Sequence, residues 1–195
     1  MNPHDTLKPK KCKADGCITK FTPRTPMQCV CGPACAQLFA RAKKEQAETK
    51  ARQVARKADR AKRESLKTRS DWMREAQSEV NRYVRLRDHS DGCISCDKPA
   101  GWLGQWHASH FRSVGAASAV RFNTWNIHKS CSICNNHKSG NIHDYTPRII
   151  LKIGVDKYEF LKSQNNIYSY SIEYLKRVKY VFRKKANRLE KRIFC

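Results

Sequence analysis

Two closely spaced cysteine pairs in the middle of the chain constrain its fold more than any other sequence feature. Two residues separate Cys93 from Cys96, and two residues separate Cys131 from Cys134. Each pair is typical of a zinc knuckle. Two knuckles supply the four thiolates of a tetrahedral site that leaves zinc no open coordination position. The spacing therefore predicts one structural zinc ion that joins two distant segments.

A second cysteine cluster lies near the N-terminus, where Cys12 and Cys17 precede Cys31 and Cys35. Two close pairs separated by a short loop can surround a further zinc ion. Cys29 is an alternative to Cys31, because either residue gives a feasible spacing. We predict that residues 1–35 form an N-terminal zinc-binding module and that a helix begins near Cys35.

The net charge and the hydropathy of the chain limit which partners it can bind and in which cellular compartment it is expected. The 195-residue chain carries 40 Lys and Arg against 17 Asp and Glu, a formal net charge of +23. It has no apolar run near the roughly 18 residues of a membrane span, and its opening lacks the apolar region of a signal peptide. We therefore expect a cytoplasmic protein with no membrane partner. Its reduced cysteines should bind zinc, and its partner should be a polyanion, most often nucleic acid.

Basic segments flank the cysteine-rich centre. Residues 36–69 carry 12 basic and 4 acidic side chains and consist mostly of Ala, Lys, Arg, Glu and Gln, with no Gly or Pro. This composition predicts a long basic helical connector that is too poor in apolar residues for a coiled coil. Residues 146–195 carry 13 basic and 4 acidic side chains. They are predicted to form a basic helical C-terminal region suited to phosphate contacts.

Local signals predict where the remaining helices begin and end. Ser70 is a candidate N-cap for a helix whose apolar face packs on the central module. Thr146 and Pro147 are expected to open a short helix that Gly154 ends, and Ser171 is expected to begin an amphipathic helix. The apolar residues at helical spacing after Ser70 are Trp72, Ala76, Val80, Tyr83 and Val84.

The central segment, residues 88–145, concentrates side chains suited to chemistry, including six of the seven histidines. Residues 106–112 are predicted to form a strand and turn that carries His107 and His110. Residues 135–141, directly after the second knuckle, are predicted to form a helix start and turn that carries Asn135 and His137. Zinc binding by the knuckles would bring these segments together, so we expect a second metal pocket between them.

These motifs resemble known proteins. The paired cysteines, the strand histidine and Cys131-Ser-Ile-Cys134-Asn135 are similar to the HNH, or ββα-metal, nucleases, especially junction resolvases of the endonuclease VII type. Over nearly the whole chain, the sequence resembles the lambdoid phage recombination proteins called NinG or Rap. The residues that carry this second resemblance, besides the N-terminal cluster and the basic helix, are Arg87-Asp88, Cys93-Ile-Ser-Cys96, Arg121-Phe122-Asn123, Asn126-Ile127-His128-Lys129 and the run from Cys134 to Asn141.

The resemblance implies a structure-specific endonuclease that acts on branched recombination intermediates such as Holliday junctions and D-loops. By the same resemblance, His110 matches the histidine that activates water as a general base. Asn135 matches a ligand of the catalytic divalent metal, Mg or Mn, and His107 is implied to bind metal or phosphate. For His137, two roles stay open: contact with the metal, or support of the residues that contact it.

Two further central residues are candidates for loop support and for metal binding. Asn126 resembles the middle asparagine of the HNH motif and is expected to hold the loop rather than touch substrate. Asp88 is the reserve carboxylate ligand, because a hard ion prefers oxygen donors.

We therefore predict an α+β protein with a zinc-stabilised HNH-like core over residues 70–145, flanked by the N-terminal module, the connector and the C-terminal helical region. The predicted function is metal-dependent hydrolysis of branched DNA. A homodimer is a hypothesis that the sequence does not test, and recombination proteins are further candidate partners. The alternative is a non-catalytic, zinc-containing DNA-binding or annealing mediator of recombination.

Overall fold

The computed structural model describes residues 7–194 and divides the chain into two units, with the boundary between Leu66 and Lys67. The chain is helix-rich and contains two small antiparallel sheets, which gives a mixed α+β protein. Among the described residues, none of the helices has the length and apolar character needed to cross a membrane.

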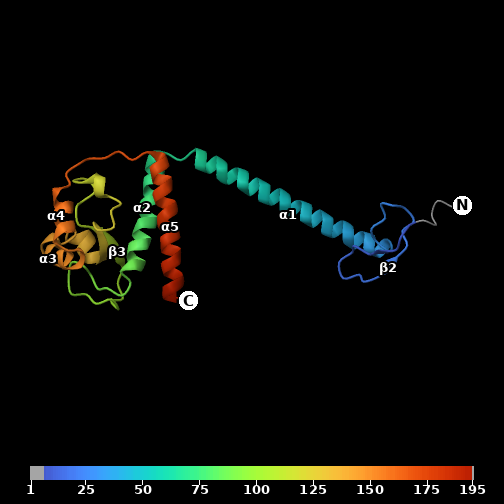
Figure 1. Cartoon of the computed structure of the whole chain (residues 1–195), viewed down its shortest axis with the longest axis horizontal. Coiled ribbons are helices and arrows are strands. Elements are labelled where there is room, and N and C mark those ends of the chain that lie inside the picture. The colour runs from blue at the N-terminus through green and yellow to red at the C-terminus, as the bar shows by residue number, and fades with distance from the viewer. Residues whose placement is uncertain (1–6, 195) are drawn as a thin grey trace. The chain divides into compact units, whose positions relative to one another are not determined.

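The first unit consists of a small hairpin followed by one long helix. Strands β1 (Lys10–Lys11) and β2 (Lys20–Phe21) pair antiparallel, and α1 spans Pro33–Ser65. Figure 1 shows α1 as an uninterrupted helix, and none of its residues is buried. The predicted connector is thus helical, but it ends at residue 65 instead of 69. Its good helix formers stabilise it without a packed face, as they do in long isolated helices.

The second unit opens with α2 (Arg69–Arg87), whose start corrects a sequence prediction. The N-cap is Thr68, not Ser70. The Thr68 hydroxyl accepts the Asp71 backbone N–H at 3.2 Å, and the Asp71 carboxylate accepts the Thr68 N–H at 3.0 Å. This reciprocal capping box requires an acidic or amide side chain three residues after the cap, and Asp71 meets that requirement for Thr68.

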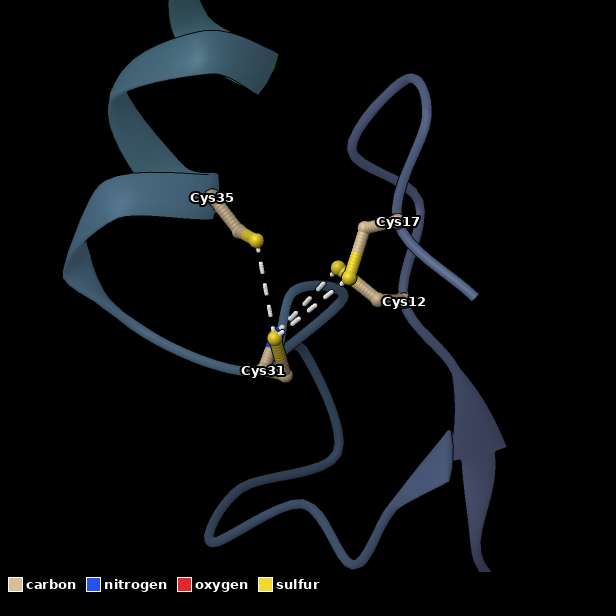
Figure 2. Close-up of side chains that lie close together, drawn as sticks. All are labelled: Cys12, Cys17, Cys31 and Cys35. Atoms are coloured by element: carbon tan, nitrogen blue, oxygen red, sulfur yellow. Dashed lines mark hydrogen bonds between the residues drawn. The ribbon is translucent and has the colours of Figure 1, made fainter. Parts of the chain in front are cut away.

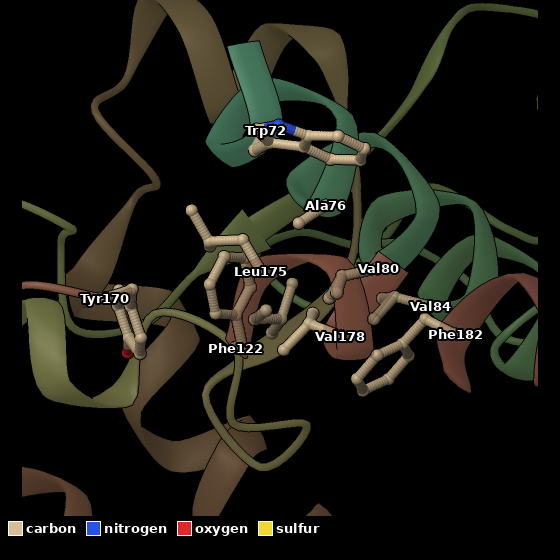
Figure 3. Close-up of a cluster of buried hydrophobic side chains, with 10 residues drawn as sticks. Trp72, Ala76, Val80, Val84, Phe122, Tyr170, Leu175, Val178 and Phe182 are labelled. Carbon is tan, nitrogen blue, oxygen red and sulfur yellow. The ribbon is translucent and has the colours of Figure 1, made fainter. Parts of the chain in front are cut away.

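Helix α2 packs beside α5 (Ile172–Phe194), and the two helices form the main hydrophobic core (Figures 1 and 3). The ion pairs Glu75–Lys179 and Glu79–Arg183 both join residues 104 positions apart, so the helices run parallel. The predicted apolar face of α2 and the predicted start of α5 after Ser171 are confirmed. The buried residues of this core are Trp72, Ala76, Val80, Val84, Phe122, Ile127, Tyr170, Leu175, Val178 and Phe182.

A two-stranded sheet lies against this helix pair. Strands β3 (Trp106–His110) and β4 (Ile127–Cys131) are antiparallel, with His107 opposite Ser130 and His110 opposite Ile127. Successive side chains alternate between faces. Ala108 packs on the α2–α5 core, whereas His128 hydrogen-bonds Tyr145 of α3 on the other face at 3.1 Å. The sheet therefore separates the α2 side of the unit from the α3 side.

Short helical segments complete the second unit. The 3₁₀ turn η1 (Ser118–Val120) lies between the strands, and the π-helical segment η2 (Ile133–His137) follows β4 directly. Helix α3 spans Ile142–Ile153 and α4 spans Val155–Ser163.

The start of α3 corrects the prediction at Thr146 and Pro147. The helix begins five residues before Pro147, which lies inside it, while Gly154, at φ 87°, ends it as predicted. Buried Tyr145 explains the earlier start, because it packs with Ile149 and Leu161 in a second core. Its N–H donates to the Asn141 carbonyl at 3.0 Å, closing the first helical turn.

Candidate active site

The N-terminal cysteines form a four-sulfur cluster (Figure 2). The Sγ atoms of Cys12, Cys17, Cys31 and Cys35 all lie within 4.8 Å of one another, and Cys17 and Cys31 are 3.8 Å apart. Zinc–sulfur bonds of about 2.3 Å in a tetrahedron place the sulfurs about 3.8 Å apart, so the cluster fits a zinc ion. Cys31 joins the cluster and Cys29 does not, which decides between the two spacings.

Local backbone and side-chain groups support this cluster. The Cys12 sulfur accepts N–H groups from Ala14 and Cys31, each at 3.4 Å. Hydrogen bonding with Thr19 lowers the pKa of Cys17 to about 6. A zinc ligand must be a thiolate, and these donors favour that form.

The second cluster, Cys93, Cys96, Cys131 and Cys134, meets the same test. Its sulfurs also lie within 4.8 Å of one another, and Cys96 and Cys131 are 3.8 Å apart. The Cys93 sulfur accepts the Cys131 N–H at 3.2 Å. Burial raises the pKa of Cys93, so an anionic sulfur here needs the charge of a metal ion.

A glycine permits the tight turn of the first knuckle. The Cys93 N–H donates to the Lys98 carbonyl at 2.9 Å. A Cβ on Gly92 would lie 2.5 Å from that same carbonyl oxygen. The knuckle therefore has no room for a side chain at position 92.

The second cluster fixes the corner between β4 and η2. Cys131 is the last residue of β4, and Cys134 lies inside η2. Asn135 follows directly, and its Nδ2 lies 3.1 Å from His107 Nδ1 on β3. The cysteine clamp thus brings together two of the predicted site residues although 28 positions separate them.

A polar pocket of about 480 Å³ adjoins this His107–Asn135 pair. Asn81 and Arg85 of α2 line it, together with Gln105 before β3. Among the described residues that line it there is no carboxylate. The sequence reasoning did not single out Asn81 or Arg85, although their spacing of four residues places them on one face of a helix.

His110 does not line this pocket, which corrects the expectation that both strand histidines share it with Asn135. It is three residues from His107, so strand alternation directs the two side chains to opposite faces of the sheet. His110 Nε2 lies 2.9 Å from the Arg121 carbonyl oxygen. A carbonyl can only accept, so Nε2 carries the proton and Nδ1 keeps its lone pair. Burial lowers the pKa of His110, which keeps the ring neutral at neutral pH.

The remaining candidates have distinct surroundings. Asn126 is fully buried, and its amide bonds the Arg112 backbone N–H at 2.7 Å and carbonyl at 3.1 Å, so it holds the loop as expected. His137 is exposed at the end of η2 and has no side-chain hydrogen bond within residues 7–194.

Asp88 is engaged in a buried ion-pair network rather than offered to the pocket. Its carboxylate accepts two bonds from the Arg87 guanidinium, both at 2.7 Å, and one from the Lys129 N–H at 3.1 Å. Lys152 Nζ lies 3.1 Å away. The Asp88 oxygens already bind protein donors, so these contacts do not favour the reserve-ligand role, which stays a prediction.

Comparison with known proteins assigns the chain to a family. The sequence model described as "Bacteriophage Lambda NinG protein" matches residues 4–192. The chain belongs to the NinG family. Protein ninG of Escherichia phage lambda is 35% identical over 195 residues, covering 92% of this chain and 93% of the relative. Protein ninG of Salmonella phage P22 is 32% identical over the same shares.

Part of the NinG chain is more similar in other relatives. Protein ninG of Escherichia phage 933W is 38% identical over 125 residues, which covers 64% of this chain and 61% of the relative. No solved structure matches the chain.

Proposed function

We propose that this NinG family member is a metal-dependent, structure-specific endodeoxyribonuclease with an HNH-like core, acting on branched DNA in the host cytoplasm. The observation that carries the proposal is the His107–Asn135 contact of 3.1 Å, made across a sheet-and-helix corner clamped by four cysteines. The order β3, β4, η2 supplies the two strands and helical segment that such a core requires.

The divalent metal would be held by the His107 imidazole nitrogen and the Asn135 amide oxygen. The amide nitrogen of Asn135 faces His107 Nδ1 at 3.1 Å, so the amide would have to flip to turn its oxygen to the ion. When bound, such an ion stabilises negative charge on phosphate oxygens. An imidazole ligand without a carboxylate favours manganese over magnesium, because magnesium prefers oxygen donors. The chemistry of the donor set thus fits a weakly held, exchangeable ion rather than a structural one.

His110 is the proposed general base. Its Nδ1 lone pair takes a proton from water as the water oxygen attacks phosphorus, and one sugar oxygen leaves with the bond electrons. The Arg121 carbonyl holds the ring in the required tautomer. His107 and His110 lie on opposite faces of β3, and three residues of strand span roughly 10 Å. The substrate backbone therefore has to cross the edge of β3 to reach both side chains.

The charge of the chain supports a DNA substrate. A net charge of +23 favours phosphate binding without base readout, which suits recognition of a branched shape. Symmetric cleavage of a four-way junction requires two active sites, so we propose that two copies act together. Sedimentation of the chain with and without a junction tests this part.

Cleavage of a labelled four-way junction with manganese or magnesium tests the proposed activity. His110→Ala should lower the rate by about 10²–10⁴-fold at every metal concentration, as expected for loss of a general base. His107→Ala and Asn135→Ala should instead raise the metal concentration needed for half-maximal rate. His143→Ala is the matched control, because His143 is an exposed histidine on α3.

The outcomes separate the proposal from the mediator alternative. Junction binding by the zinc-loaded wild type without cleavage in either metal would favour the non-catalytic mediator. Full cleavage by His110→Ala would remove His110 as the base while leaving the metal pair to be tested by the other two variants.

A further inference from the structure

A continuous groove runs along α2 beside the free edge of β3. Two adjoining pockets, of about 510 and 480 Å³, share Asn81 and Arg85. The first extends along α2 to Arg74 and Arg121, and the second reaches His107 and Asn135. We call the two pockets together the α2 groove. It connects the candidate metal pair to a surface that the sequence did not identify.

The α2 groove has the charge expected of a polyanion site. Three arginines, at positions 74, 85 and 121, line it, and no Asp or Glu does so among the described residues. By contrast, the pocket beside the second cysteine cluster is lined by Asp91 and Asp97, which pair with Lys152 and Arg148. Of these three, Arg74 pairs with Asp71 and Arg121 donates to the Gln77 side-chain oxygen at 2.9 Å, whereas Arg85 has neither kind of partner in the part of the chain that the structure describes. A basic side chain without a local acidic partner is available to phosphate oxygens.

Arg85 occupies the centre of this groove and is not engaged by the protein. Within residues 7–194, its guanidinium has no hydrogen-bond or ion-pair partner, although burial and the neighbouring Arg82 lower its pKa. Two other buried or partly buried cations of the unit are engaged by the protein: Arg112 donates to the Gln164 carbonyl at 3.0 Å, and Lys129 donates to the Asp91 carbonyl at 2.6 Å. A half-buried guanidinium without an acceptor favours an external anion.

The β3 backbone adds donors along the same groove. The Ser132 N–H donates to the Gln105 carbonyl at 2.9 Å, and the Phe111 N–H donates to the Asn126 carbonyl at 2.8 Å. Residues 105 and 111 thus direct their backbone groups toward β4. The alternate residues 106, 108 and 110 direct theirs to the opposite edge, where the described sheet has no further strand. Ala108 lines the groove at this edge.

We propose that the α2 groove binds the phosphate backbone of one DNA strand, with Arg85 holding a phosphate next to the His107–Asn135 pair. This inference rests on the proposed DNA substrate, and it assigns the strand a track along β3. A strand on this track passes from the His107 end of β3 toward the Arg121 end, where His110 lies. Phosphate contacts position the strand without reading its sequence.

Binding of a fluorescent four-way DNA junction, with the zinc-loaded full chain and no added manganese or magnesium, tests the proposal. Arg85→Gln should weaken binding several-fold and reduce the slope of log affinity against log salt by about 0.7–0.9, the loss of one phosphate contact. Arg85→Lys keeps the charge, so it should keep the slope. Lys157→Gln, at an exposed position of α4, is the control with the same charge change and should leave affinity and slope near wild type.

The results distinguish this proposal from the proposed activity. Wild-type affinity and salt slope in Arg85→Gln, with unchanged zinc content, would overturn the groove assignment whether or not the chain cleaves DNA. An Arg85-dependent slope in a chain that cleaves no junction would support the groove and refute the nuclease. Equal losses in Arg85→Gln and Lys157→Gln would also overturn the assignment, because they would show only a diffuse charge effect.

Discussion

Replacement of the buried Asp88 by asparagine should destabilise the second unit more than the same replacement of an exposed aspartate. Asp88 is 2% exposed and connects the end of α2 with β4 and α3. Burial alone would raise the pKa of this carboxyl, but hydrogen bonds and charge from Arg87, with a contribution from Lys152, lower it below its ordinary value. The folded state therefore holds Asp88 as a carboxylate.

The size of the effect follows from what asparagine leaves behind. Arg87 also donates to the Thr124 and Ile127 carbonyls, both at 2.8 Å, so it cannot turn to water without breaking those bonds. Removing one partner of a buried ion pair costs about 3–5 kcal/mol, because the remaining charge stays desolvated. Asparagine has nearly the shape of aspartate, so the loss is electrostatic rather than a loss of packing.

Urea unfolding with excess zinc, followed by tryptophan fluorescence, measures this loss. All four tryptophans lie in the second unit, at positions 72, 102, 106 and 125. Asp91→Asn is the control, because Asp91 pairs with Lys152 at 2.7 Å but its side chain is 48% exposed. Exposed pairs contribute about 0–1 kcal/mol.

The pH dependence provides a second criterion. A carboxyl with a lowered folded-state pKa stabilises the fold above its unfolded pKa and loses that contribution as pH falls through its folded pKa. Wild type and Asp88→Asn should therefore converge in strong acid. An Asp88→Asn free energy of unfolding within about 1 kcal/mol of the Asp91→Asn value at pH 7 would refute the ion-pair account.

Three further outcomes follow from the structure. Metal analysis should find two zinc ions per chain, and Cys131→Ser should lower the count to one; a single ion in wild type would contradict one of the clusters. Thr68→Ala should cost about 1 kcal/mol in urea unfolding through loss of the α2 N-cap, whereas Ser70→Ala should cost less. Burial lowers the pKa of His128 to about 3. As pH falls, His128 is therefore protonated in the unfolded state before it is protonated in the folded state. The free energy of unfolding should fall by up to about 1.4 kcal/mol per pH unit below pH 6.5, and the fall should be shallower in His128→Gln.

The metal clusters were the most predictable part of the fold. Cysteine spacing predicted both four-sulfur sites, because a tetrahedral ion fixes ligand number and distance more strongly than any packing rule. Helical composition likewise predicted α1 and the apolar face of α2. The choice of Cys31 over Cys29 required coordinates, since either spacing can close the cluster.

Other features depend on tertiary contacts that spacing does not encode. The start of α3 is set by burial of Tyr145. The start of α2 is set instead by the Thr68–Asp71 box, whose three-residue spacing the sequence does carry. The separation of His107 from His110 follows from strand alternation, a local rule that could have been applied to the sequence. The role of Asp88 could not have been read in this way, because its partners come from three different elements.

The four-cysteine cluster and the proposed catalytic metal site of the second unit place unequal demands on the fold. Four thiolates bind zinc strongly enough to organise a chain segment, whereas one imidazole and one amide cannot. Cys131 and Cys134 hold the β4–η2 corner, and β4 holds β3 through the register that sets His107 opposite Ser130. The cysteine cluster therefore sets the positions of His107 and Asn135, which together would bind a metal only weakly. Ligands placed by such a clamp remain free to exchange a metal, as the proposed hydrolysis requires.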